Sequence, residues 1–186
     1  TYEKRGNVTE AIEYYQKAMS EFPFESANYD LVRGYIYILQ KNIPEGTRTL
    51  DRTLAIDPDN LYAQKRMGKV YLGEFEGGTA DYDKALPYNE KAYELKKDNE
   101  TTYNLALNYY FLNRESTALP MFESLINTSQ DSAYLRYYLG MMYYYSGDLK
   151  KAKKFLNDVR VIDSNFEDGY DLIDRILLEK EEEPYD

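Results

Sequence analysis

Small and apolar residues return along this chain at intervals close to 34 residues. The small residue that anchors each copy is Ala11, Gly46, Ala85, Ala118 or Ala152, and successive anchors are 35, 39, 33 and 34 residues apart. Most copies carry a large residue four positions after the anchor, namely Tyr15, Leu50, Phe122 and Leu156. A fixed period of this length is typical of stacked supersecondary units that cannot bury their apolar faces alone. The pattern therefore predicts a helical repeat array.

Each copy contains two segments whose apolar residues recur with the 3.6-residue period of an amphipathic helix. Ser132 is placed as an N-cap, and Gly147 suits the left-handed conformation that ends a helix. Turns rich in Asp, Asn and Pro separate the copies. The predicted helices are Thr9–Glu21, Ser26–Gln40, Pro44–Ile56, Leu61–Leu72, Asp83–Lys96, Glu100–Leu112, Glu115–Asn127, Ser132–Tyr145, Asp148–Ile162 and Phe166–Glu181.

Two irregularities interrupt the repeat. Pro87 and Pro120 each follow an anchor alanine by two residues. Because proline removes one backbone hydrogen bond, each should bend its helix while facing away from the core. The third copy also carries an insertion over residues 73–82. Its aromatic residues Phe75 and Tyr82 either contact a partner or pack locally, and we expect local packing.

The copies resemble the tetratricopeptide repeat. That motif pairs Leu-Gly and Tyr in a first helix with Ala, an aromatic residue, Ala and Pro in a second. The residues that carry the resemblance are Tyr2, Gly6, Ala11, Tyr15, Ala18 and Pro23; Met67, Gly68, Tyr71, Ala85 and Ala92; Leu105, Ala106, Tyr109, Ala118 and Phe122; and Leu139, Gly140, Tyr143, Gly147 and Ala152. The resemblance implies an all-α fold, a right-handed superhelical α-solenoid of antiparallel helix pairs with a C-terminal capping helix.

The chain departs from the motif in two places. The position usually held by Trp carries Gln64, Thr102 and Arg136. The second copy fits two registers, one through Gly34 and Tyr37 and the other through Leu31, Val32 and Tyr35. These departures leave details of the packing open.

We expect one array over residues 1–186. It comprises a partial unit at 1–25, units at 26–60, 61–98, 99–131 and 132–165, a cap helix at 166–181 and an acidic tail at 182–186. Tyr2–Lys4 would be the stub of a truncated first helix, and the start at Thr1 in mid-pattern indicates an excised fragment.

The last predicted helix has one apolar stripe, and its other face and the run Glu179–Glu183 are polar. A stripe of Phe166, Tyr170, Ile173 and Leu177 would cover the last unit, which an open-ended array requires. In the alternative, Leu172 and Ile176 meet a further repeat. The acidic run near the end of the chain favours the cap.

Composition excludes several kinds of chemistry. The chain has no Cys and no His, so disulfides, thiol chemistry, most zinc sites and His-based catalysis are not expected. The formal net charge of −10 argues against a nucleic-acid partner. No window has the roughly 20 apolar residues that direct membrane insertion needs. No motif for catalysis, a metal or a cofactor appears, so we expect no enzyme activity.

The resemblance also implies a binding surface, because in tetratricopeptide arrays the first helix of each unit lines a concave groove. The residues at the corresponding positions are Tyr62, Lys65, Lys69, Tyr103, Leu107, Tyr110, Tyr134, Tyr137, Met141 and Tyr144. This set predicts an aromatic groove with a local basic spot at Lys65 and Lys69. Such a groove suits a peptide with apolar anchors and an acidic residue. For any single tyrosine, packing remains the alternative.

The sequence therefore predicts a non-catalytic scaffold that binds a protein or peptide partner in a Tyr-rich groove. Three alternatives stay open. The chain could be a docking or regulatory segment of a larger, enzymatic protein, or a self-association module that forms a homo-oligomer. A groove for a glycan is the third alternative, which the absence of Trp disfavours.

Overall fold

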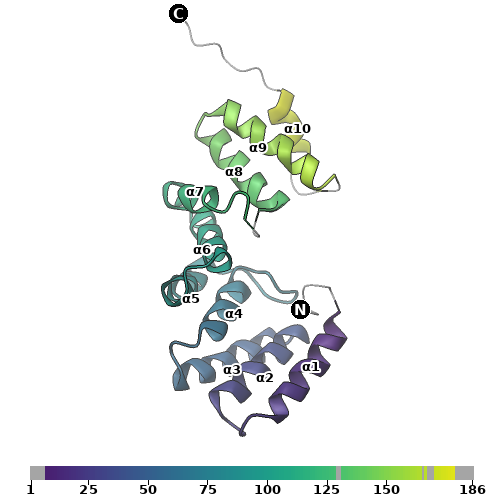
Figure 1. Ribbon diagram of the computed structural model, residues 1–186, viewed down its shortest axis with the longest axis vertical. Coiled ribbons are helices and arrows are strands. Elements are labelled where there is room, and N and C mark those ends of the chain that lie inside the picture. The colour runs from purple at the N-terminus through teal and green to yellow at the C-terminus, as the bar shows by residue number, and fades with distance from the viewer. Residues whose placement is uncertain (1–6, 129–130, 165, 167–169, 179–186) are drawn as a thin grey trace, which may run out of the picture. The chain divides into compact units, whose positions relative to one another are not determined.

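The computed structural model describes residues 7–128, 131–164, 166 and 170–178, and all regular secondary structure in these residues is helical (Figure 1). This confirms the all-α prediction. The helices are α1 (Val8–Ser20), α2 (Ala27–Leu39), α3 (Ile43–Ile56), α4 (Leu61–Tyr71), α5 (Tyr82–Leu95), α6 (Asn99–Phe111), α7 (Glu115–Glu123), α8 (Ala133–Tyr145), α9 (Leu149–Ile162) and α10 (Tyr170–Leu178).

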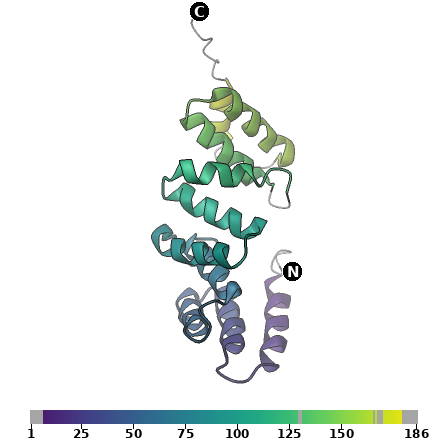
Figure 2. The same cartoon turned by 60° about the vertical axis from the view of Figure 1, so that its left-hand side comes forward.

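The chain forms two compact units, residues 1–112 with α1–α6 and residues 113–186 with α7–α10. Within the first unit α2 packs on α1 and α3, and α5 packs on α4 and α6. Within the second, α8 packs on α7 and α9. Figure 2 shows consecutive helices of a pair running in opposite directions. A single continuous array remains a prediction, as does its division into the repeat units given above, and the predicted stub Tyr2–Lys4 lies outside the described residues.

Local chemistry explains where the helices start and stop. Most helices begin at an Asn, Asp or Ser whose side chain accepts a hydrogen bond from the backbone N–H three residues later. The first helix of each pair is followed by one residue at positive φ. This φ is 83° at Gly73, after α4, and 86° at Gly147, after α8. Lys41 and Asn113 adopt the same conformation at the ends of α2 and α6. The same helix-ending turn therefore recurs in copies that carry another residue in place of glycine.

Glycines let the paired helices approach closely. An added Cβ would lie 2.8 Å from Leu50 at Gly34 and 2.6 Å from Leu156 at Gly140. At Gly68 it would lie 2.1 Å from Asn89. Each glycine thus faces the residue four positions after the anchor of the partner helix. The second copy therefore follows the register of Gly34 and Tyr37.

The helix α7 is shorter than predicted. It ends at Glu123 rather than Asn127, and the next residues form turns with bonds between positions three apart, such as Leu125 N–H to the Phe122 carbonyl at 3.1 Å. Asn127 has a φ of 63° and donates its N–H to the Asp131 carboxylate at 2.8 Å. This side-chain acceptor competes with the helical bond. Pro87 and Pro120 are both exposed, as predicted.

The last helix covers the preceding pair with a stripe that differs from the predicted one. Phe166 and Ile173 are buried as expected, but Ile176 is fully buried as well, whereas Leu177 is only partly buried. Ile176 and Leu172, which the alternative assigned to a further repeat, pack on the core of this unit instead. The side chain of Tyr170 lies outside the described residues. The prediction was wrong about Ile176 because a helix stripe can follow either i+3 or i+4 spacing.

The insertion over residues 73–82 folds back on the first unit. Phe75 packs against the core cluster formed by α2, α3 and α4. Tyr82 stacks on Phe111 with ring centroids 4.6 Å apart, and Lys41 pairs with Glu76 at 2.6 Å. The structure supports local packing of both aromatic residues.

We predict that Gly140→Ala lowers the free energy of unfolding by about 1–3 kcal/mol, because the new Cβ would overlap Leu156 in a filled core. Urea unfolding followed by circular dichroism measures the change. The exposed Lys150→Ala on the same helix pair is the control and should have little effect. An unfolding curve for Gly140→Ala that matches the wild type would contradict the close approach.

Candidate functional site

The first helices of the residues 1–112 unit form one surface, because α4 contacts both α2 and α6. We call this the first-helix surface, and its members are Tyr35, Tyr62, Lys65, Lys69, Glu100, Tyr103 and Tyr110. Most of the predicted groove residues of this unit lie on it. Tyr62 is 62% exposed, whereas Tyr103 and Tyr110 are half-buried. The predicted Leu107 is buried at 7% exposure, so it offers little area to a partner.

The two lysines of this surface are paired within the chain. Lys65 bonds to the Glu100 carboxylate, and the Lys69 ammonium lies 3.1 Å from the same group. Lys69 also lies 3.7 Å from a Glu74 carboxylate oxygen. Burial tends to raise the pKa of Glu100, but the bonds and charges of the two lysines outweigh burial and lower it. The predicted basic spot is therefore largely neutralised.

Glu100 is a charged residue of the first-helix surface that the sequence prediction missed. It stands six residues before Ala106, the same distance by which Tyr62 precedes Gly68 and Tyr134 precedes Gly140. A carboxylate at that repeat position, one unit after two lysines, is the signal that could have found it.

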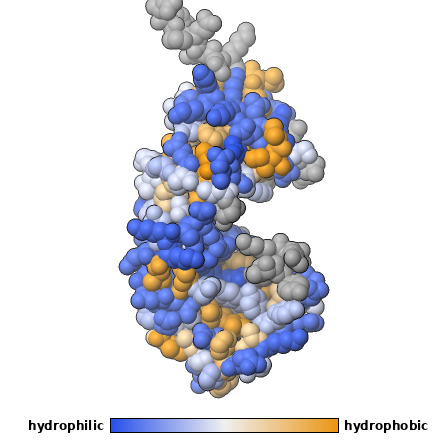
Figure 3. Space-filling view, in the orientation of Figure 1, coloured by the Kyte–Doolittle hydropathy of each residue, from blue (hydrophilic) through white to orange (hydrophobic). Residues whose placement is uncertain are grey.

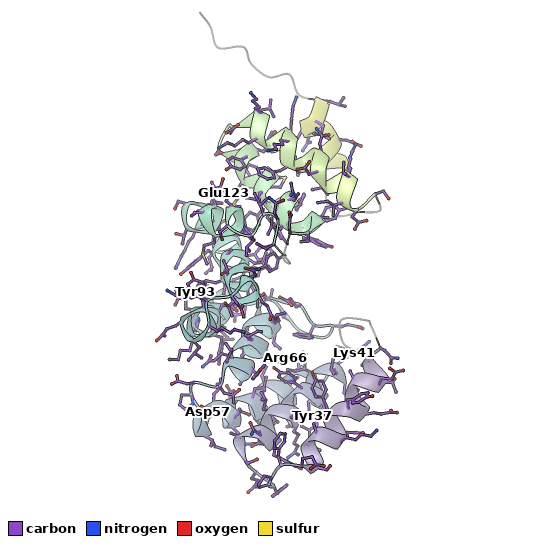
Figure 4. All side chains as sticks on the ribbon, in the orientation of Figure 1. Tyr37, Lys41, Asp57, Arg66, Tyr93 and Glu123 are labelled. Carbon is purple, nitrogen blue, oxygen red and sulfur yellow. The ribbon has the colours of Figure 1, made fainter. Side chains whose placement is uncertain are left out.

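Arg66 fixes the aromatic residues on the α2 side of the surface. It is 7% exposed, with its guanidinium carbon 3.8 Å from the centre of the Tyr35 ring and 5.0 Å from that of Phe75. The Tyr35 hydroxyl donates to the Tyr62 carbonyl at 2.9 Å. Figure 4 labels Arg66 on α4. The register through Gly34 places Tyr35 at a groove position, so its ring is held in a fixed orientation there.

The α6 side of the surface is aromatic. The ring of Tyr110 lies edge-on to Phe111 at 5.4 Å, and Phe111 stacks on Tyr82. These contacts connect the surface to the 73–82 insertion. Tyr103 lies half-buried on the same helix.

In the residues 113–186 unit, the predicted groove residues belong to α8. Tyr134 is 47% exposed and meets Phe166 edge-on at 4.9 Å. Tyr137 and Tyr144 are half-buried against the core cluster, and Met141 is part of that cluster at 2% exposure. Residues from the last helix complete this cluster, so most of these side chains pack inside the unit.

The described residues contain no group of three or more His, Cys, Asp or Glu that could hold a metal ion. Among the helices described, none combines the length and the apolar character needed to cross a membrane. Apolar side chains on the face shown in Figure 3 gather in small patches separated by hydrophilic surface.

Sequence comparison identifies two segments of the chain with a known family. The model of the tetratricopeptide repeat matches residues 1–24 and 134–161. The chain is also 28% identical over 106 residues to anaphase-promoting complex subunit 7 of Dictyostelium discoideum. That match covers 57% of this chain and 17% of the relative, so the chain spans about a sixth of the relative's length.

Solved structures share the fold over most of the chain. MamA from MSR-1 has a TM-score of 0.64 at 19% identity, covering 88% of this chain and 91% of its own. YrrB, described as a TPR protein with an unusual peptide-binding site, has a TM-score of 0.64 at 22% identity, covering 89% of this chain and 82% of its own. A thermophilic TPR protein from Thermus thermophilus has a TM-score of 0.64 at 14% identity, covering 94% of this chain and 93% of its own.

The matched segments lie in both compact units, and the shared fold extends across the helix pairs between them. Together these findings confirm the resemblance to the tetratricopeptide repeat that is seen in the sequence, and the solved structures confirm the fold.

Proposed function

We propose that this chain is a non-catalytic scaffold whose first-helix surface binds a protein or peptide partner. The observation that carries the proposal is that exposed Tyr62 stands beside half-buried aromatic residues that internal contacts already hold in place. A surface ordered before binding loses little side-chain entropy when a partner arrives. Tyrosine offers a large apolar ring together with a hydroxyl for polar contacts.

The partner would insert apolar side chains between tyrosines. Tyr62 and Tyr103 supply accessible ring area on α4 and α6. Leu107 is buried, so it would pack beneath the surface and would not contact a partner. Because Glu100 balances Lys65 and Lys69, the surface favours apolar and uncharged anchors over acidic ones.

The unit of residues 113–186 would offer partner contacts of its own through Tyr134, which is the most exposed of the predicted groove residues there. Tyr137 and Tyr144 would present only part of their rings, and Met141 would act as packing.

The relatives are consistent with this role. YrrB is described as having a peptide-binding site, and the Dictyostelium relative is named as a subunit of a complex. The same kind of fold therefore serves protein contacts elsewhere, although function follows from the site and not from the fold alone.

We predict that Tyr62→Ala combined with Tyr103→Ala weakens peptide binding at least tenfold, about 1.4 kcal/mol, because the accessible rings of the surface are lost. Peptides selected from a random library against the wild-type chain serve as probes, and fluorescence anisotropy measures their affinity. Tyr14→Ala combined with Tyr93→Ala, on α1 and α5, is the matched control and should change affinity less than threefold. Equal loss in both variants, or none in the first, would rule out this surface.

We predict that Glu100→Gln frees the lysine pair and strengthens the binding of acidic peptides several-fold, because Lys65 and Lys69 lose their shared carboxylate. Titration of an acidic peptide and its amidated counterpart measures the effect. Glu45→Gln, at a half-buried position where it removes a local pair with Arg48, is the control. Unchanged affinity for acidic peptides in Glu100→Gln would show that the lysines do not face the partner.

The interaction of Glu100 with Lys65 and Lys69 should make the free energy of unfolding depend on pH. The pKa of Glu100 is lowered from its ordinary value of 4.5, so its contribution is fully present above pH 4.5 and is lost as pH falls through the lower folded value. We expect Glu100→Gln to cost about 1 kcal/mol at pH 7 and almost nothing in strong acid. Urea unfolding at both pH values tests this, and a cost independent of pH would contradict it.

A further inference from the structure

We infer that a second site, a pocket at one end of α2 and α3, binds a carboxylate attached to an apolar group. The pocket has a volume of about 390 Å³ and is lined by Glu25, Asp30, Arg33, Arg52, Ala55 and Ile56. These residues come from the α1–α2 connection, the start of α2 and the end of α3. None of them belongs to the first-helix surface, so the inference does not depend on the proposed function.

An ion pair between the buried Asp30 and the exposed Arg52 lines the pocket. Asp30 is 3% exposed and accepts two hydrogen bonds from Arg52, from Nε at 3.1 Å and from Nη2 at 3.0 Å. This two-point contact fixes the plane of the guanidinium. In the described part of the chain, the Nη1 group of Arg52 has no hydrogen-bond partner, so it can still donate.

The neighbouring Arg33 has no carboxylate of its own. Its Nε and Nη2 groups donate to the Tyr37 hydroxyl at 3.2 and 3.0 Å, and the guanidinium also lies over that ring (Figure 4 labels Tyr37). Among the described residues, no Asp or Glu lies within 4.0 Å of this guanidinium. Tyr37 therefore orients a cation whose charge stays uncompensated. A planar, oriented guanidinium is the side chain best suited to bind a carboxylate.

The apolar and acidic residues that line the pocket determine which ligand fits. Ile56 is 58% exposed although it lines the pocket, and the exposed Ala55 lies beside it, so both can pack against an alkyl group. Asp30 and the rim residue Glu25 carry negative charge, which disfavours a dianion such as phosphate. A single carboxylate next to an apolar group fits both the charge and the walls. A peptide supplies this chemistry either as an acidic side chain or as a C-terminus that follows an apolar residue.

The test uses the full chain and small probes. Hexanoate is titrated into the protein while two-dimensional NMR follows the Nε–H signals of the arginines. We expect saturable shifts of Arg33 and Arg52, with much weaker effects from hexanol, hexylamine and inorganic phosphate. If hexanol or phosphate shifts these signals as strongly as hexanoate, the pocket does not recognise a carboxylate.

Variants tie the binding to the pocket. Arg33→Gln should weaken hexanoate at least fivefold, and Arg33→Lys should weaken it less because it keeps the charge but loses the planar fork. Arg48→Gln is the matched control, an exposed arginine on α3 outside the pocket, and should change affinity less than twofold. Thermal melts verify that each variant is folded. Equal affinities for Arg33→Gln and wild type would overturn the inference.

Two peptides identify the source of the carboxylate. Acetyl-Leu-Leu with a free C-terminus carries a terminal carboxylate, and acetyl-Leu-Glu-Leu-amide carries only a side-chain carboxylate. Stronger binding of the first assigns the pocket to chain ends, and stronger binding of the second assigns it to internal acidic residues. If hexanoate does not bind and both peptides fail, the inference is wrong. Binding of a peptide to the first-helix surface would leave the Arg33 signal unmoved, so the two sites are distinguishable.

Discussion

The close approach of paired helices is the constraint on which the other features of each unit depend. At Gly34, Gly68 and Gly140 a first helix presents bare backbone to a large or polar residue of its partner. A larger side chain would push the helices apart and tilt every residue that they carry. Side chains one residue further along the first helix, such as Tyr35 and Lys69, are aimed by this contact.

Polar groups inside the first unit reinforce the same geometry. Asn89, which faces Gly68, donates to the side-chain oxygen of Asn108 at 2.9 Å, and Asn108 donates to the Tyr82 carbonyl at 2.8 Å. Both asparagines are at most 1% exposed. Bonds of this kind hold α5 against α6, because leaving a buried amide without its partner costs more than the bond itself contributes. These bonds therefore restrict the rotation of α5 and α6 relative to each other as well as the distance between them.

The rigid framework gives the unit of residues 1–112 two surfaces with different chemistry. On the first-helix surface, aromatic rings are held by Arg66 and by backbone contacts, while Glu100 cancels the charge of two lysines. At the end of α2 and α3, by contrast, one guanidinium is compensated and its neighbour is not. The two surfaces would recognise different parts of one partner or two separate partners. The net charge of −10 steers basic segments toward the protein as a whole, so local arrangement has to supply any affinity for acidic groups.

The amino-acid sequence by itself determined the helices and their pairing. Period, capping residues and small anchors are local or repeated features, so they predicted nearly every helix boundary within one residue, including those around Gly147. Local pattern was insufficient where two spacings fit equally well, as at Ile176, or where a side-chain acceptor such as Asp131 competes with the helix.

Only the tertiary structure decided which charges meet. Glu100 lies 35 residues from Lys65, and Asp30 lies 22 residues from Arg52, so neither pair is visible in a helix-length window. The same is true of burial, because Leu107 and Met141 share their repeat position with Lys69 but are covered by neighbouring elements. Periodicity fixes the face of a helix on which a residue lies. What covers that face depends on residues from other helices, and those are brought together only when the helices pack.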